Sequence, residues 1–193
     1  MFIQTEDTPN PATIKFLPGK DVLGEGASPV EFAREDGARG SALAEMLFSI
    51  PGVARVFYGS DYISVTKTED ARWPHIKPAV LGAIMDFYVA GGDILSEDMP
   101  AAAAPAEEQV YEGETLEIVE QIKEIIELRV RPAVAQDGGD IVFRHFDDSN
   151  GVVFLEMRGA CAGCPSSSMT LKSGIENLLK HYVPEVTAVE QAA

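Results

Sequence analysis

Two cysteines, three residues apart at the end of an apolar run, constrain this chain more than any other feature of its sequence. They are Cys161 and Cys164, the only cysteines among 193 residues. The run before them, Val152–Met157, is apolar and β-branched and predicts a buried strand, while apolar residues at helical spacing follow the pair. The Cys-x-x-Cys pair is therefore expected on a strand-to-helix loop.

The residues around the pair suit a metal ligand or a reactive thiol. Pro165 fits the first turn of a helix, and the run Ser166–Ser168 supplies capping hydroxyl groups. The positive end of that helix should face both sulfurs and lower their pKa values. Gly159 and Gly163 allow positive φ and a close approach of the backbone to a bulky group.

The number of ligands decides what the pair can do. Iron–sulfur clusters and structural zinc sites usually take four protein ligands, and this chain offers two cysteines. Either the pair is a dithiol redox switch, or two chains share one metal centre. None of His75, His145 and His181 has a spacing that completes a single-chain site, although His181, on the following helix, stays open as a ligand.

Two longer stretches resemble a known family. The residues Arg-Gly-Ala-Cys-Ala-Gly-Cys-Pro-Ser-Ser-Ser at 158–168, with Gln136–Asp140 upstream, resemble the C-terminal (Nfu) domain of NifU-like iron–sulfur cluster carriers. Met1–Pro11 and Lys15–Gly19 resemble the N-terminal domain of the Nfu proteins of mitochondria and related bacteria. The resemblance covers nearly the whole chain, apart from the segment near residue 100 and the extreme C-terminus.

The resemblance implies an iron–sulfur cluster carrier, or scaffold. No general acid, base or nucleophile stands out in the sequence, so no enzymatic activity is expected. Cys161 and Cys164 of two chains would bind one shared [4Fe–4S] cluster, so the loaded form would be a homodimer; a [2Fe–2S] form stays open. Upstream cluster-assembly proteins would load it, and apo iron–sulfur client proteins would receive the cluster. Two alternatives are a thioredoxin-like dithiol oxidoreductase and a dimeric structural zinc module. A predicted antiparallel hairpin before the pair argues against the thioredoxin-like fold.

The charge of the chain excludes some partners. Its formal net charge is −16, and acidic residues occur throughout, which argues against nucleic acid or an anionic membrane as partner. No run approaches the roughly 18 apolar residues that span a bilayer. Met1–Pro11 does not have the composition of a secretory signal or a mitochondrial presequence. We therefore expect a cytoplasmic, bacterial protein, or one of the mitochondrial matrix if a presequence has been removed.

The sequence predicts an α+β chain of two small α/β domains joined by a flexible linker rich in Ala, Pro and Glu. The predicted parts are an N-terminal Nfu-type accessory domain at 1–96, the linker at 97–113 and a C-terminal NifU-like cluster-binding domain at 114–193. The accessory domain has no cysteine, and the resemblance gives it a role in meeting donor or client proteins. Its Thr8–Pro11 turn is either a recognition surface or a loop stiffened by proline.

Strands and helices follow from periodicity and from turn residues. The predicted elements of the first domain are strands at 2–5, 14–16 and 30–32, a helix that Ser41 caps and Pro51 ends, a hairpin at 53–66 and a helix from Trp73. Those of the second are a helix at 114–130 that Pro132 kinks or ends, a turn at 137–140, a hairpin of strands 141–146 and 152–157, a helix at 165–182 and a strand at 186–189.

A few other residues near the pair have two interpretations each. Arg158 and Ser166 could contact the sulfurs, but Arg158 equally fits a solvated strand end. Gly138 and Gly139 are expected to serve backbone geometry rather than chemistry. Two methionines are interpreted as packing around the loop: Met157 and Met169.

Overall fold

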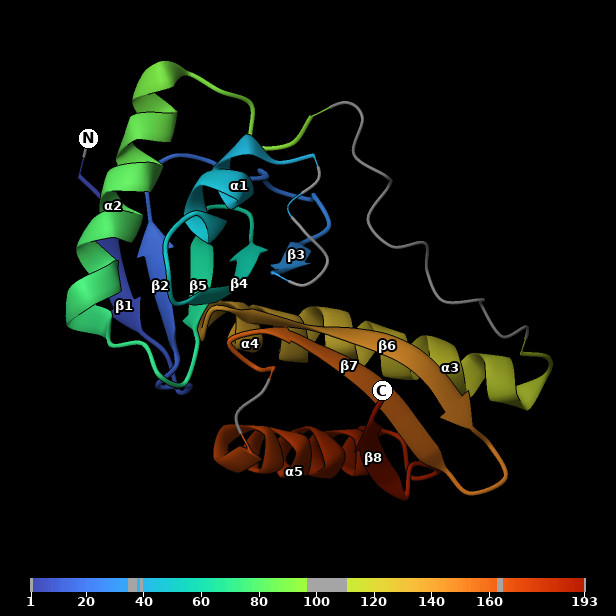
Figure 1. Ribbon diagram of the computed structural model, residues 1–193. Coiled ribbons are helices and arrows are strands. Elements are labelled where there is room, and N and C mark those ends of the chain that lie inside the picture. Colours follow the sequence, from blue (N-terminus) through green and yellow to red (C-terminus); the bar gives the residue numbers. More distant parts are fainter. Residues whose placement is uncertain (1, 35–37, 39, 97–110, 163–164, 193) are drawn as a thin grey trace. The chain divides into compact units, whose positions relative to one another are not determined.

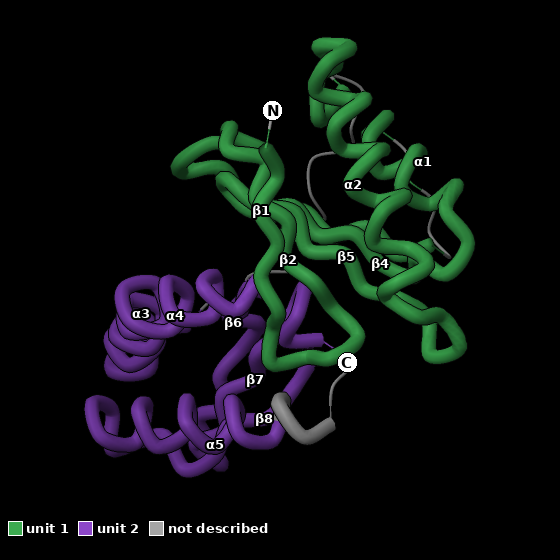
Figure 2. Tube along the Cα trace, turned by 90° about the vertical axis from the view of Figure 1, so that its left-hand side faces the viewer, with its two compact units in different colours: residues 1–103 green, residues 104–193 purple. Residues whose placement is uncertain are grey.

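The computed structural model describes residues 2–34, 38, 40–96, 111–162 and 165–192, with only the backbone described at 165–168 (Figure 1). The chain forms two compact units, residues 1–103 and 104–193 (Figure 2). Both units combine helices with a β-sheet, so the predicted α+β class with two domains is confirmed. Most of the predicted linker, residues 97–110, lies outside the described residues, and the predicted boundaries at 96 and 113 stay predictions.

Unit 1 contains an antiparallel sheet of five strands in the order β1-β2-β5-β4-β3. The strands are β1 (Gln4–Asp7), β2 (Thr13–Leu17), β3 (Val30–Ala33), β4 (Val53–Tyr58) and β5 (Ile63–Lys67). Strand β1 begins two residues later than predicted, and the predicted hairpin forms β4 and β5. Gly59, in the turn of that hairpin, leaves no room for a side chain, since an added Cβ would lie 2.3 Å from the ring of Tyr62.

Helices α1 (Ala42–Phe48) and α2 (Trp73–Ala90) pack on one face of this sheet. Ser41 caps α1 as predicted, because its hydroxyl oxygen accepts a hydrogen bond from the Ala44 N–H at 3.2 Å. The core residues come from both layers: Ile14, Phe16, Val56, Ile63 and Val65 from the strands, and Leu43, Leu47, Val80 and Ile84 from the helices. Unit 1 therefore buries its own core.

The Thr8–Pro11 turn is held by contacts within unit 1. Asn10 is 3% exposed, and its side-chain oxygen accepts a hydrogen bond from the Ala12 N–H at 3.0 Å. The indole N–H of Trp73 donates to the carbonyl oxygen of Pro11 at 3.1 Å, which ties the turn to the start of α2. Of the two interpretations of this turn, these contacts favour a loop stiffened by proline over a recognition surface.

Unit 2 contains a three-stranded sheet in the order β6-β7-β8. Its strands are β6 (Gly139–Asp147), β7 (Val152–Gly159) and β8 (Ala188–Gln191). Strands β6 and β7 form the predicted antiparallel hairpin, and β8 runs parallel to β7. Gly139 and Asp140, predicted in a turn, already belong to β6, and β8 begins two residues later than predicted because Val186 closes a turn with Val183.

The helices of unit 2 pack against one face of its sheet. They are α3 (Glu114–Ile125), η1 (Ile126–Val130), α4 (Arg131–Gln136) and α5 (Pro165–Tyr182). The shared core takes Val119, Ile122, Ile126, Val130 and Val134 from the first helical stretch, Ile141, Val153, Leu155 and Val189 from the sheet, and Ile175 and Leu179 from α5.

Pro132 does not end the helical stretch that begins at Glu114. The π-helical turn η1 comes directly before it, and α4 continues to Gln136. Proline lacks an N–H and clashes with the carbonyl of the preceding turn, and a π turn changes this hydrogen-bonding pattern over a single turn. The predicted break is therefore a local change of helix type.

In the part of the chain that the structure describes, no helix has both the length and the apolar character that crossing a membrane requires.

Candidate functional site

Cys161 lies on the loop between β7 and α5, as predicted. Gly159 ends β7 with φ of +62°, a conformation that glycine adopts readily. Two hydrogen bonds then turn the chain: the Cys161 N–H donates to the Arg158 carbonyl at 3.3 Å, and the Ala162 N–H donates to the Gly159 carbonyl at 3.1 Å. Cys164 lies outside the described residues, as do the side chains of Ser166–Ser168.

The start of β6 supports this loop from the side. The Ala160 N–H donates to the Gly138 carbonyl at 3.1 Å, and Gly139 is in register with Gly159. A Cβ atom added to Gly139 would lie 2.5 Å from the sulfur of Cys161 and 2.8 Å from the carbonyl oxygen of Arg158. Real Cβ atoms do not make contacts this short, so a side chain at this position would force the sulfur and the backbone of the loop to shift. The expectation that Gly138 and Gly139 serve backbone geometry agrees with these contacts.

The Cys161 thiol is buried. The residue is 6% exposed and belongs to the core of unit 2. Burial, followed by the charges of Asp137 and Asp140, raises the pKa of the thiol from 9.0 to about 12. The lowered pKa predicted for Cys161 is therefore wrong, because this sulfur sits in apolar surroundings and near carboxylates. For Cys164 the lowered pKa stays a prediction.

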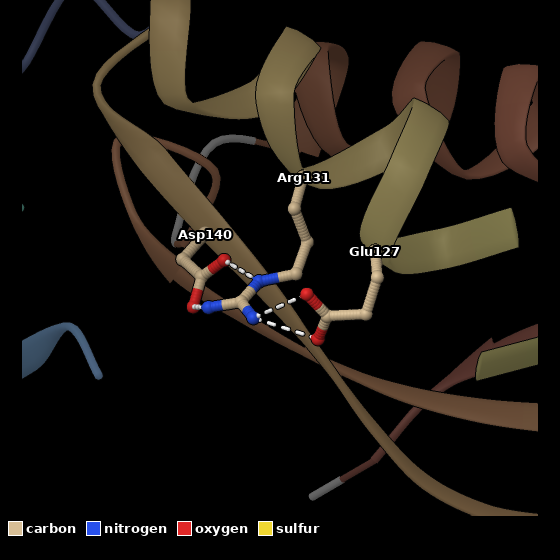
Figure 3. A network of polar contacts seen from close by, with 3 residues as sticks. All are labelled: Glu127, Arg131 and Asp140. Atoms are coloured by element: carbon tan, nitrogen blue, oxygen red, sulfur yellow. Dashed lines mark hydrogen bonds and ion pairs between the residues drawn. The ribbon is translucent and has the colours of Figure 1, made fainter. Parts of the chain in front are cut away.

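Three charged residues form a network beside the loop (Figure 3). Asp140 is 4% exposed, and Arg131 donates to both of its carboxylate oxygens, from Nε to Oδ1 at 2.7 Å and from a terminal nitrogen to Oδ2 at 3.1 Å. The other terminal nitrogen of Arg131 donates to both oxygens of Glu127, at 2.7 and 2.9 Å. The hydrogen bond to Asp140 is the main cause that raises the pKa of Arg131.

Other residues named from the sequence have different surroundings. Arg158 donates from Nε to Glu156 at 2.7 Å, and Arg144 also contacts Glu156, so Arg158 belongs to a charged group on the sheet. Met157 is buried in the core, as predicted. Met169 is 67% exposed, so its predicted role in packing is wrong: its side chain lies on the outward side of α5.

Two of the three histidines contact aromatic rings in unit 2, and the third belongs to unit 1. His145 stacks on Phe154 with ring centroids 4.1 Å apart, and His181 meets the ring of Tyr182 edge-on. His181 follows the start of α5 by 16 residues, about 24 Å along a helix axis, which is too far for a ligand shared with the loop. His75 belongs to α2 of unit 1. The described residues contain no group of three or more His, Cys, Asp and Glu side chains that could hold a metal ion.

The sequence did not reveal the pairing of Arg131 with Asp140. A charged residue directly after two glycines, at the start of an apolar strand, was the available signal for a buried carboxylate. Its partner could not be predicted, because the two residues meet only when the chain turns back between α4 and β6.

Comparison with protein families gives a match to both units. Residues 3–91 match the family described as scaffold protein Nfu/NifU N terminal. Residues 122–190 match the NifU-like domain, and this range includes the cysteine loop and the network around Asp140.

Curated relatives match the chain almost from end to end. NifU-like protein 4, mitochondrial, of Arabidopsis thaliana is 50% identical over 99% of this chain and 66% of its own length. NifU-like protein 5, mitochondrial, of the same plant is 49% identical over 99% of this chain and 68% of its own. The NFU1 iron-sulfur cluster scaffold homolog, mitochondrial, of Drosophila ananassae is 49% identical, over 99% of this chain and 64% of its own. The chain thus spans about two thirds of the length of these relatives.

The names of these relatives correct one expectation. All three are mitochondrial proteins by name, which contradicts the bacterial cytoplasmic location expected from the sequence. That expectation rested on the composition of Met1–Pro11, and the composition of one segment does not determine where a protein resides. The resemblance carried by the cysteine loop and the opening residues is confirmed, because both domain families match in order and two relatives are 50% and 49% identical. This chain belongs to the NifU-like (Nfu) family.

Proposed function

We propose that this protein is an iron–sulfur cluster carrier, in which Cys161 and Cys164 of two chains bind one [4Fe–4S] cluster between them. The cluster is its cargo, received from upstream cluster-assembly proteins and passed on to apo iron–sulfur proteins. Loading makes the protein a homodimer. No step of this function requires a catalytic residue.

The observation that carries the proposal is the supply of thiol ligands. The chain has two cysteines, and they lie in the part that matches the NifU-like domain. A cluster takes about four cysteine ligands. The described residues contain no group of three or more His, Cys, Asp and Glu side chains that could hold a metal ion together with Cys161. Several relatives are named as iron–sulfur cluster scaffolds. A second copy of the chain is the simplest source of two more thiolates.

The loop accounts for how a cluster would be held and released. A thiol must lose its proton to bind iron, so loading releases a proton from the buried Cys161. In the described conformation its sulfur faces the core, so binding a cluster shared with a second chain requires the Cys161 side chain to rotate outward, while the backbone at the base of the loop keeps its hydrogen bonds to Gly138 and Arg158. A cluster held by four thiolates from two chains can then leave by ligand exchange with an acceptor.

Anaerobic reconstitution with iron and sulfide tests the proposal. The wild-type protein should turn brown, and a native mass measurement on the same sample should give two chains per four-iron cluster. Cys161→Ser and Cys164→Ser should each abolish the colour. Adding an apo iron–sulfur acceptor should move the absorption to the acceptor. Colourless wild-type protein, or a cluster bound to a single chain, would contradict the proposal.

The same samples separate the two alternatives. A zinc module would contain zinc after purification and would unfold with a chelator. A dithiol oxidoreductase would reduce a disulfide substrate, a reaction that requires an accessible thiolate, and the raised pKa of Cys161 works against that reaction.

We also propose that unit 1 is an accessory domain that meets donor or client proteins, and that the domains are bounded at residues 96 and 114. Limited proteolysis should cut between these positions and leave two folded fragments. Only the fragment with the cysteine loop should bind a cluster.

A further inference from the structure

We propose that Arg131 and Asp140 are a positioning pair for the cysteine loop: the buried ion pair fixes the start of β6, and the start of β6 fixes Cys161. The inference rests on the proposed function, because the value of a fixed loop is that it binds the cluster. Arg131 and Asp140 act through the backbone and are not proposed as ligands.

The first step is the burial of Asp140. Its side chain is 5% exposed, and that of Arg131 is 28% exposed. Moving a carboxylate out of water is unfavourable, so a buried ion pair contributes little net stability, whereas removing one partner strands the other charge. The presence of this ion pair is therefore better explained by the fixed position that it gives to the start of β6. Here the guanidinium group is itself oriented by Glu127 on the preceding helical turn (Figure 3).

The second step is the path from Asp140 to the sulfur. Asp140 follows Gly139 directly and is in register with Arg158 on β7. The Arg158 carbonyl accepts the Cys161 N–H, and the space above Gly139 is filled by the Cys161 sulfur. A shift of β6 by less than 1 Å at this point would press on the sulfur or open a gap beside it.

The third step is charge. A cluster bound by thiolates is an electron-rich, negatively charged group, and a carboxylate close to it opposes binding. Asp140 follows Gly139 directly, and the Cys161 sulfur fills the space above Gly139, so this carboxylate belongs to the residues at the base of the loop. Arg131 neutralises Asp140 with two hydrogen bonds, so the pair supplies the geometry while the charge of Asp140 itself is compensated.

Four variants test the pair: Arg131→Met, Arg131→Lys, Asp140→Asn and the double variant Arg131→Met/Asp140→Asn. Arg131→Met leaves the carboxylate unpaired, Arg131→Lys keeps the charge but loses the two-pronged contact, and the double variant removes both charges. The control is Arg129→Met. Arg129 belongs to the same helical stretch, and its guanidinium carbon lies over the Tyr182 ring, 4.9 Å from the ring centroid.

The first readout is hydrogen exchange of the apo protein, which does not depend on any cluster. In Arg131→Met, exchange of the Ala160 and Cys161 amides should rise about tenfold or more relative to the amide of Val153 in the core, since one charged hydrogen bond is worth about this factor. Arg131→Lys should lie between Arg131→Met and the wild type. The double variant should return most of the way to the wild type, because no charge is stranded, and Arg129→Met should match the wild type.

The second readout is the half-life of the reconstituted cluster, followed by its visible absorption. It should fall in the same order, by about tenfold in Arg131→Met, and recover in the double variant. If Arg131→Met does not fold, the double variant and Arg131→Lys carry the test. Equal loop exchange in all folded variants, or a double variant as impaired as Arg131→Met, overturns the positioning role. Wild-type protein that never binds a cluster overturns the proposed function and leaves the exchange result standing.

Discussion

The two units of this chain use buried polar groups in different ways. In unit 1, the hydroxyl groups of Ser41 and Tyr58 lie 2.9 Å apart inside the core, where they join the start of α1 to β4, and burial raises the pKa of Tyr58. Unit 1 also buries a charged residue, Lys15, but its ion-pair partner Glu6 is exposed. Among the described residues of unit 2, the buried polar residue is Asp140, whose carboxylate is paired with Arg131 beside the cysteine loop. Neutral groups join two elements at small electrostatic cost, whereas a buried charge pair imposes one geometry.

Substitutions should therefore have different effects in the two units. Unit 1 has no cysteine and the larger sheet, so changes in its core should alter its stability alone. Unit 2 has a three-stranded sheet, and Gly139 and Asp140 lie in register with Gly159 and Arg158, directly before the cysteine loop. Changes there should alter cluster binding as well as stability.

The substitution with the largest expected effect should act on unit 2 alone. Cys161→Ser should reduce cluster binding to the background level, because serine does not replace a thiolate as an iron ligand, while unit 1 stays folded. Absorption after reconstitution measures the first effect. The fluorescence of Trp73, the only tryptophan, measures the second, since it lies in α2 of unit 1. A tryptophan signal that changes with this substitution would contradict the independence of the units.

Gly139→Ala should have the next largest effect. The added Cβ would meet the sulfur of Cys161 and a backbone oxygen, and overpacking of this kind costs about 2 kcal/mol. The free energy of unfolding of unit 2, measured by hydrogen exchange, should fall, and so should the yield of bound cluster. Gly174→Ala is the matched control: nothing lies within 4 Å of the added Cβ, and alanine in a helix should stabilise by about 0.5–1 kcal/mol. If both variants behave alike, the close contact at Gly139 is not restrictive.

Tyr58→Phe should have a smaller effect, limited to unit 1. It removes the hydroxyl group that meets Ser41 in the core, which should lower the free energy of unfolding by about 1 kcal/mol. Denaturant unfolding followed by Trp73 fluorescence measures this loss. Cluster half-life should be unchanged, and a shortened half-life would mean that the core of unit 1 influences the cysteine loop.

The last expected effect appears only above pH 9.0: the stability of unit 2 should depend on pH in the apo Cys164→Ser variant. The pKa of Cys161 is raised in the folded state, so its folded thiol resists ionisation while the unfolded thiol ionises near 9.0. Its contribution to stability is therefore complete below pH 9.0 and is lost as the pH rises to about 12. Unfolding curves of this variant and of a Cys161→Ala/Cys164→Ser variant should diverge in that range. Parallel curves would indicate an accessible thiol.

Much of the fold and part of the site could be predicted from local patterns. The β6–β7 hairpin and helix α5 follow from periodicity, and the position of Cys161 after a buried strand follows from the residues on either side of it. Of the two outcomes predicted at Pro132, a kink or an end of the helix, the end does not occur, because a π turn directly before the proline lets the helical stretch continue. The pKa of Cys161 was predicted with the wrong sign because a helix N-terminus was visible in the sequence and burial was not.

The sequence by itself determined the order of the elements, the family of the chain and its two cysteines, because these depend on residue types at short spacings. The tertiary structure alone decided that Arg131 meets Asp140, that Gly139 lies against the Cys161 sulfur and that this sulfur is buried. These facts depend on which segments come together in space. The free energy of burying a charge or a thiol is set by those neighbours and not by the residue itself.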